Sequence, residues 1–269
     1  MAEGATAKAG GGSEPALRIE GQGGVLRLVL DRPAQRNALS AELLGALEAA
    51  LRDAARDPAV RAIVIAGNGP AFSAGHDLRE IANGSSADTD EVFRRCSIVM
   101  QLLHEVPQPT VARVHGIATA AGCQLVAACD LAVAAASATF ATPGVRIGLF
   151  CSTPAVPLVR AIGRKRALEM LFTGAPIDAR TALEWGLVNR VVPDVELDRS
   201  IDELVAPILA ASAHAVALGK QTFYRQVDRP EHEAYEVASE TMCVNAADDD
   251  AHEGIAAFLG KRSPTWKRR

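Results

Sequence analysis

Apolar and polar positions change their spacing several times along the chain, and each spacing predicts a different element. Residues 17–20 and 24–30 are short runs of mainly aliphatic side chains around a Gly-Gln-Gly-Gly turn, which predicts two paired strands. Residues 41–55 repeat leucines at helical spacing behind the cap candidate Ser40, which predicts a helix. Residues 60–66, VRAIVIA, end at a Gly-Asn-Gly-Pro turn and predict a buried strand.

The alternation of strand and helix patterns continues through the middle of the chain. Residues 91–104 predict a helix, 110–115 a strand, 119–129 a short helix and 131–134 another strand. The polar patch from Asn83 to Asp90 predicts a mobile loop. This order implies right-handed crossovers and a mainly parallel sheet.

Beyond Pro154 the pattern becomes almost wholly helical. Six segments show helical spacing: residues 165–172, 179–185, 197–211, 213–225, 231–246 and 249–259. We therefore predict an α/β fold, with a core over residues 16–195 and a helical C-terminal region over residues 196–269.

Composition limits the partners and the location. The 269 residues include 51 alanines but 11 aromatic residues, so small and aliphatic side chains must form most of the core. The 28 basic and 32 acidic residues give a net charge of −4, which argues against nucleic-acid and membrane-surface partners. The most apolar stretch, residues 117–141, is interrupted by Gln124 and Asp130 and makes a poor membrane span.

The N-terminus and the cysteines bear on the compartment. Residues 1–15 are small and polar, without the apolar segment of a signal peptide or the arginines of a transit peptide, which predicts a disordered leader. The five cysteines are odd in number and contain no CxxC pair, so neither a disulfide framework nor a zinc site is indicated. These features predict a cytoplasmic protein in a reducing environment.

Two joins between a strand and a helix carry candidate chemistry. Residues 71–78, AFSAGHDL, follow the buried strand, and residues 115–124, HGIATAAGCQ, follow the strand that ends at His115. Their small side chains leave backbone N–H groups accessible, and a helix that begins near Ala121 adds its positive dipole end. Two such N–H groups that converge on one oxygen stabilise an oxyanion. The alternative is that both joins are tight turns packed on the sheet.

These joins, together with other segments, resemble the crotonase (enoyl-CoA hydratase/isomerase) superfamily. The resemblance covers about residues 17–262. The matching segments are Asp31-Arg32-Pro33, Asn37-Ala38-Leu39, residues 72–78, 115–131, 140–149, 171–174, 182–188 and 253–259. The resemblance implies a spiral of ββα units with a helical trimerisation region, and homotrimers that usually pair as hexamers. It also implies an acyl-CoA thioester whose carbonyl oxygen binds two backbone amides, by motif position those of His76 and Ala121.

The resemblance also shows a departure from the hydratases of the family. These use two glutamates to add water across an enoyl double bond, because one carboxylate must activate water and a second carboxyl must protonate carbon. Gln124 and Gly144 occupy the two glutamate positions. We therefore do not expect efficient hydration by this route, and the chain resembles the enoyl-CoA hydratase domain-containing subgroup.

Several polar residues near these positions leave alternatives open. Gln124 either orients a water or a substrate group or satisfies backbone amides. Cys151 is either a nucleophile or a buried inert thiol, and Ser152 and Thr153 are candidates to cap the next helix. Arg146 either meets a substrate carboxylate or lies on the surface.

Coenzyme A is expected as part of the substrate, with no separate cofactor and no metal. The expected contacts of the CoA moiety are Arg32, Arg36, Ala74, Asp77, Leu78, Lys261 and Arg262. Lys261 and Arg262 either reach the nucleotide, across subunits in some family members, or form a solvated helix end.

Two functions of different classes follow. The first is an enzyme, a lyase or isomerase of the crotonase superfamily in fatty-acid metabolism, that stabilises a thioester oxyanion or enolate; decarboxylation and hydrolysis of an acyl-CoA are further possibilities. The alternative is a non-catalytic acyl-CoA-binding paralogue.

Overall fold

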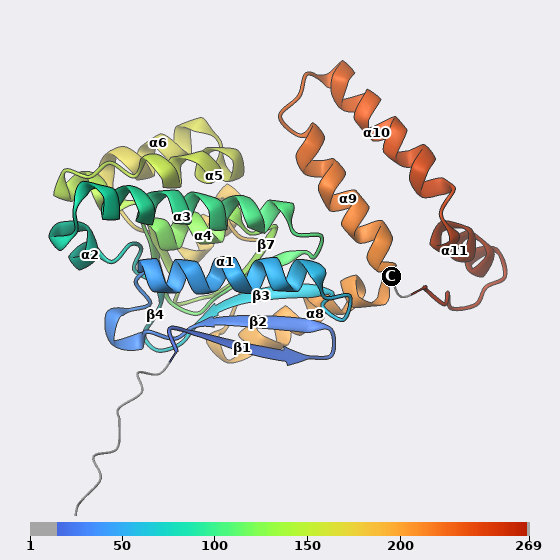
Figure 1. The fold of residues 1–269 in the computed structure, drawn as a ribbon, viewed down its shortest axis with the longest axis horizontal. Helices are drawn as coiled ribbons and strands as arrows, with labels where there is room; N and C mark the ends of the chain where they lie inside the picture. Colours follow the sequence, from blue (N-terminus) through green and yellow to red (C-terminus); the bar gives the residue numbers. More distant parts are fainter. Residues whose placement is uncertain (1–14, 268–269) are drawn as a thin grey trace, which may run out of the picture.

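The computed structural model describes residues 15–267, so the predicted leader, residues 1–15, lies outside the described residues except for Pro15. Two sheets form the centre of the fold (Figure 1). The larger has the order β1-β2-β3-β5-β7-β10, with β1 antiparallel to β2 and the other neighbours parallel. Its strands are β1 (Leu17–Gln22), β2 (Val25–Leu30), β3 (Ala62–Gly67), β5 (Thr110–Val114), β7 (Leu131–Ala135) and β10 (Arg190–Val192). The predicted parallel sheet is confirmed.

A second, smaller sheet was not predicted. Its strands are β4 (Ala71–Ser73), β6 (Ile117–Thr119), β8 (Thr139–Ala141) and β9 (Ile177–Asp178). Each of β3, β5 and β7 is followed within a few residues by a strand of this sheet and then by a helix, so the chain winds through repeated ββα units. Strands of two or three residues are too short to show a period-2 pattern, so they could not be recognised before the structure was known.

Helices α1 (Ala41–Arg56), α2 (Leu78–Asn83) and α3 (Ser86–Glu105) follow the first units. Ser40 caps α1, as predicted, by accepting a hydrogen bond from the Leu43 N–H. The predicted mobile loop from Asn83 to Asp90 is wrong, because α3 begins inside it. Ser85 and Asp88 form a reciprocal capping box that starts the helix. A polar first turn of a helix has the composition of a loop. Only the three-residue spacing of Ser85 and Asp88 indicates that a helix begins there.

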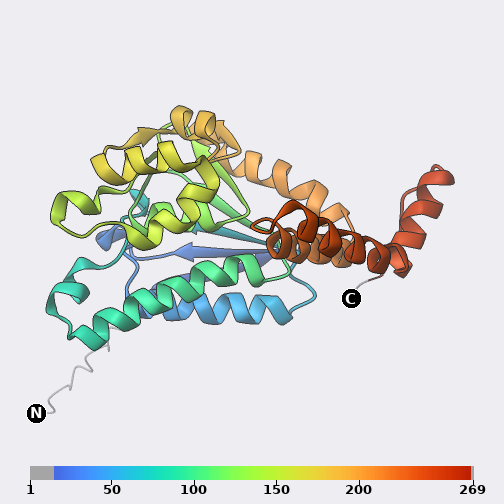
Figure 2. The ribbon, with the colours of Figure 1, turned by 90° about the horizontal axis from the view of Figure 1, so that it is seen from above.

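Helices cover both faces of the larger sheet (Figures 1 and 2). Helices α1, α3, α4 (Ala121–Ala128), α5 (Ser152–Ile162), α6 (Arg164–Thr173) and α7 (Ala179–Trp185) contribute to the main core, together with Ile63 and Ile65 of β3. Ala62 and Val64 point to the opposite face, where they pack against α8 (Leu197–Ala210). The short 3-10 helices are η1 (Pro33–Gln35), η2 (Pro143–Ile147) and η3 (Asp194–Glu196).

Helices α9 (Ala213–Gln226), α10 (Glu231–Ala246) and α11 (Asp249–Leu259) form an arm that projects from the core (Figure 1). Their bounds agree with the predicted helices to within one residue. Large apolar side chains on the arm are exposed, among them Tyr235, Met242 and Phe258. Within residues 15–267 no single helix has the length and hydropathy of a membrane span; one pair, Asp194–Ala210 with Ala213–Gln226, passes the same test together but is bent by 105°.

Candidate functional site

The two predicted joins lie in direct contact with each other. Gly75 has φ +90°, and a Cβ added there would lie 2.8 Å from the Cβ of Ala120 and 3.1 Å from the backbone nitrogen of Ala121. A Cβ on Gly122 would lie 2.3 Å from the carbonyl oxygen of Ser73. Any larger residue would separate the joins, so these glycines permit the close approach.

Backbone pairing with Leu39 uses the peptide groups on either side of His76 and leaves the His76 N–H outside this pairing. His76 forms a parallel bridge with Leu39, in which the Leu39 N–H donates to the Gly75 carbonyl at 2.7 Å and the Asp77 N–H donates to the Leu39 carbonyl at 3.3 Å. Those two bonds use the groups on either side of His76. Among residues 15–267 the His76 N–H has no hydrogen-bond acceptor.

Ala121 also carries an unpaired amide, for a different reason. It is the first residue of α4, and the N–H groups of a first turn have no acceptor within the helix. Ala120 precedes it with φ +49° and ψ −118°, a backbone conformation that alanine rarely adopts. This local strain sets the direction in which α4 begins.

Both residues line a cavity of about 680 Å³. Its lining comprises Ala74, His76, Leu78, Phe93, Ala120, Ala121, Pro143, Gly144, Arg146, Ile147, Leu149, Phe150, Cys151, Ser152, Thr153 and Pro154. The wall is largely apolar and contains no carboxylate from the described residues. This volume and apolar lining are typical of a small-molecule site.

The two positions without glutamate are placed very differently. The buried side chain of Gln124 is absent from the cavity wall of the described structure, and its amide oxygen lies 4.0 Å from the Cys96 sulfur on α3. Gly144 does line the cavity, but a Cβ there would lie 2.0 Å from the Leu149 carbonyl oxygen and 2.8 Å from the Cys151 sulfur. The segment after η2 therefore occupies the space that a side chain at position 144 would need.

The titratable groups in the wall are mostly held neutral. Burial lowers the pKa of the His76 ring to about 4, and the ring packs edge-on against Phe93 at 5.0 Å between centroids. Burial raises the pKa of the Cys151 thiol, so a nucleophilic thiolate is not favoured there. Ser152 and Thr153 do not cap α5, since both lie inside its first turn and Cys151 precedes it without a side-chain cap.

The residues expected to bind CoA divide into two groups. Ala74 and Leu78 line the cavity, and Asp77 caps α2 beside them. The guanidinium of Arg32 is already bound, to the Ala38 carbonyl at 2.8 Å and the Asp77 carboxylate at 3.2 Å. Arg36 joins this region through its carbonyl, which accepts from the Ala74 N–H at 2.9 Å, and its side chain is exposed.

Within this chain, Lys261 and Arg262 lie apart from the other residues expected to bind CoA. They follow α11, on the arm that projects from the core (Figure 1). Arg262 forms an ion pair with Glu253 at 2.6 Å. Neither residue lines the cavity in the described structure.

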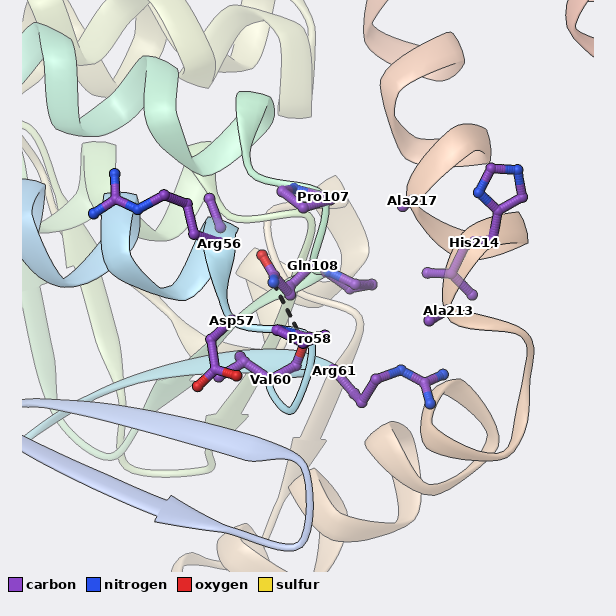
Figure 3. A pocket seen from close by; sticks show the side chains of 13 residues that line it. Arg56, Asp57, Pro58, Val60, Arg61, Pro107, Gln108, Ala213, His214 and Ala217 are labelled. Atoms are coloured by element: carbon purple, nitrogen blue, oxygen red, sulfur yellow. Dashed lines mark hydrogen bonds between the residues drawn. The ribbon is translucent and has the colours of Figure 1, made fainter. Parts of the chain in front are cut away.

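A second hollow, of about 310 Å³, lies between the core and the start of α9 (Figure 3). Its basic groups already have partners: Arg61 donates to the Ala211 carbonyl at 2.7 Å, Arg56 pairs with Asp53 at 2.6 Å and His214 lies 3.5 Å from Asp248. The side chains of these basic residues are therefore already engaged by other groups of the chain. Across residues 15–267 no group of three or more His, Cys, Asp or Glu is placed to hold a metal ion.

Comparison with known proteins agrees with the fold. Residues 20–269 match the family model described as enoyl-CoA hydratase/isomerase. The chain is 48% identical over 265 residues to a mouse protein, enoyl-CoA hydratase domain-containing protein 3, covering 98% of this chain and 88% of the relative. Solved structures of an enoyl-CoA hydratase from Mycobacterium smegmatis and of human enoyl-CoA hydratase domain-containing protein 3 superpose with TM-scores of 0.92 and 0.91. They are 50% and 46% identical, and the matches cover 94% and 93% of this chain and 99% and 100% of those chains.

These relatives overturn one expectation and establish another. The mouse protein and its counterparts from rat, Xenopus laevis and human are named as mitochondrial, which contradicts the predicted cytoplasmic location. Sparse, unpaired cysteines indicate a reducing compartment but do not distinguish one such compartment from another. The extent of the family match and the shared fold lead to one conclusion: this chain belongs to the enoyl-CoA hydratase/isomerase family, the crotonase superfamily.

Proposed function

We propose that the protein processes acyl-CoA thioesters and that the amides of His76 and Ala121 bind the thioester oxygen. The observation that carries this proposal is that two amides without acceptors lie on touching joins in the wall of one apolar cavity. Donors of this kind stabilise negative charge as it develops on an oxygen, by about 3 kcal/mol for each donor in comparable sites. An enolate or a tetrahedral oxyanion fits this arrangement.

The reaction we propose is not hydration by a pair of glutamates. Gln124 is an amide turned toward Cys96, and an amide cannot serve as a general base. At Gly144 the Leu149 carbonyl leaves no room for a glutamate. Replacing both residues by glutamate is therefore not expected to restore hydration of crotonyl-CoA unless the segment from Gly148 to Cys151 also moves.

An enolate formed by isomerisation or decarboxylation, or a hydrolytic oxyanion, remains compatible with the two amides. Isomerisation and decarboxylation need stabilisation of an enolate more than a base that activates water. The alternative function, a non-catalytic acyl-CoA-binding protein, is favoured by the absence of any carboxylate in the described cavity wall. The two functions differ in turnover, not in binding.

A pair of ligands tests the role of the amides without altering the protein. Butyryl-CoA and its thioether analogue, S-butyl-CoA, differ at the carbonyl group. We expect isothermal titration calorimetry to give about tenfold tighter binding of the thioester, which corresponds to about 1.4 kcal/mol for the hydrogen bonds to oxygen. Equal affinities would rule out an oxygen-binding role for the two amides.

Turnover then separates the enzyme from the binding protein. The panel is crotonyl-, 3-enoyl-, methylmalonyl- and 3-hydroxyacyl-CoA, followed by mass spectrometry. Any turnover should disappear in Ala121→Pro, which lacks the amide at a helix position that tolerates proline. Circular dichroism must show that the variant folds, because Ala120 also becomes restricted. Turnover that persists in a folded variant would contradict the proposed role of Ala121.

We also propose that the arm assembles the protein into homotrimers or hexamers. The exposed apolar side chains of Phe223, Tyr235, Met242 and Phe258 on the arm support this. Assembly would give Lys261 and Arg262 a route to the CoA of a neighbouring subunit, while Arg36 would meet a phosphate within the same subunit. Light scattering coupled to size-exclusion chromatography should give three or six times the chain mass of 28.2 kDa; a monomer would exclude this assembly.

A further inference from the structure

Arg146 is the one residue in the cavity wall of the described structure with a permanently charged side chain. It lies on η2, two residues after Gly144, the position that in the family resemblance carries one of the two glutamates acting on the acyl group. The other polar groups in the wall are uncharged or neutral, since burial lowers the pKa of His76 and raises that of Cys151. The cavity is thus apolar with a single cation.

Two contacts fix the direction of this arginine. Its Nε donates to the carbonyl oxygen of Thr173, at the end of α6, at 3.2 Å. Its stem crosses Gly174, where an added Cβ would lie 3.1 Å from Nε and 3.4 Å from Cγ. Gly174 has φ +61°, so the end of α6 has the shape that admits the arginine stem. An arginine held in this way loses little conformational freedom when it binds a ligand.

The outer nitrogens of Arg146 remain open. Within residues 15–267 they make no hydrogen bond and no carboxylate lies within ion-pair distance, whereas Arg56 and Arg61 beside the second hollow are both engaged. Ile147, Leu149 and Phe150 flank this position and are themselves exposed, so the surroundings are apolar. Arg146 is exposed, so water screens its charge, and its attraction for a carboxylate depends on the paired geometry of two hydrogen bonds.

We infer that Arg146 selects acyl-CoA substrates whose acyl group carries a carboxylate, which its two outer nitrogens bind as a fork. The planar guanidinium matches a carboxylate with two parallel hydrogen bonds, which a lysine cannot reproduce. This inference rests on the proposed function, because it names the substrate class of the same cavity. It excludes an unsubstituted alkyl chain as the preferred ligand.

Matched pairs of ligands test the inference and cancel the contribution of CoA. The pairs are isobutyryl- and methylmalonyl-CoA, butyryl- and succinyl-CoA, and hexanoyl- and adipyl-CoA, in which a methyl group is exchanged for a carboxylate at increasing distance from the thioester. Calorimetry on the wild-type protein should show a preference of about tenfold for the carboxylate in at least one pair.

Variants of the arginine should then remove that preference. Arg146→Met should bring the favoured pair to equal affinity or reverse it, and Arg146→Lys should keep only part of it. Binding of the alkyl member should change less than about twofold in both variants. Arg180→Met is the matched control: Arg180 is exposed, pairs with Glu184 and lies outside the cavity wall, so its loss should leave the preference intact.

Three outcomes would overturn the inference. The first is a wild-type protein that binds the alkyl member of every pair as tightly as the carboxylate. The second is a preference that survives in Arg146→Met. The third is an equal loss of both members in Arg146→Met, since that would place the arginine on a CoA phosphate. Failure of all six ligands to bind would instead refute the proposed function itself.

Discussion

The two ends of α4 differ in how completely their polar groups are satisfied. At the N-terminal end Ala121 presents an amide without an acceptor, behind a strained Ala120, to a largely apolar cavity. Beyond the C-terminal end Asp130 accepts from the Thr110 N–H at 2.6 Å and the Tyr224 hydroxyl at 2.7 Å. It also pairs with Lys220 at 2.7 Å.

The difference separates the part that we propose binds a ligand from a part that fixes the structure. Lys220 and Tyr224 belong to α9, so the cluster at Asp130 joins the arm to the core. Lys220 also donates to the carbonyls of Leu103 and Gln108 at 2.7 and 2.8 Å. Groups satisfied within the chain hold α4 in place, whereas the amide at its other end has no acceptor among the described residues.

Breaking the satisfied end should have the largest effect. Lys220→Met leaves the Asp130 carboxylate partly buried without its cation, and should lower the free energy of unfolding by about 3 kcal/mol. Urea denaturation measures this. Asp130→Asn combined with Lys220→Met should recover part of the loss in a double-mutant cycle. A loss below 0.5 kcal/mol, typical of exposed pairs, would show that the cluster does not fasten the arm.

Acid should destabilise the protein through the ring of His76, which lines the same cavity as Ala121. Its ring titrates near pH 4 in the folded protein but near 6.5 when unfolded, and Nε2 is buried without a partner among the described residues. The unfolded chain therefore takes up the proton first, so stability falls between pH 6.5 and pH 4, by up to about 3 kcal/mol at the lower limit.

The variant His76→Phe isolates this contribution, because it keeps the ring contact with Phe93 and the backbone amide. Urea denaturation of both proteins from pH 8 to pH 4 should show the steeper loss in the wild type, so that the stability of the variant relative to the wild type rises by up to about 3 kcal/mol as the pH falls. Parallel curves would mean that the ring is not held neutral by burial.

Adding a side chain at Gly144, in the wall of the same cavity, should also destabilise the protein. In Gly144→Ala the new methyl group would meet the Leu149 carbonyl at 2.0 Å, and the shift this forces should lower the stability by about 2 kcal/mol. Gly219→Ala on α9 is the control: nothing lies within 4 Å of that position, and alanine should favour the helix slightly. Similar effects of the two changes would show that the Gly148–Cys151 segment yields readily.

Relieving strain at the open end should stabilise the protein. In Ala120→Gly the backbone keeps φ +49° and ψ −118° without a Cβ to clash, which should raise the free energy of unfolding by about 1 kcal/mol. The greater conformational freedom of glycine in the unfolded chain offsets part of this gain. Ala118→Gly, at a fully buried position of β6 without positive φ, should destabilise instead. A loss of stability in Ala120→Gly would mean that the backbone there is not strained.

Much of the larger sheet and most helices could be predicted, because their patterns are local. Leucines at helical spacing gave α1, and VRAIVIA gave β3, since each element buries one face or both. The start of α3 was missed because the polar patch around Ser85 and Asp88 resembles a loop in composition. The short strands β4 and β6 were missed because three residues show no period, although their loops were recognised as a candidate site.

The candidate site likewise has features that could be recognised from the sequence and features that could not. The two joins could be recognised from small residues at strand ends, whereas the choice of the His76 and Ala121 amides came from the family resemblance. The orientation of Gln124 toward Cys96 and the Leu149 carbonyl over Gly144 could not be recognised, because both depend on segments that meet only after folding. The sequence likewise left two roles open for Arg146, and its Nε contact with Thr173 comes from the end of a separate helix.

By itself, the sequence determined the family, the alternation of strands and helices, and the residue types at the candidate oxyanion amides and at the two positions without glutamate. These are properties of residue identity and local spacing, which are written along the chain. Only the tertiary structure decided that the space beside Gly144 is filled, that Arg32 is bound to Asp77, and that Arg146 is held with its outer nitrogens open. Those facts depend on which atoms from distant segments compete for the same volume or hydrogen bond, and only close packing settles that competition.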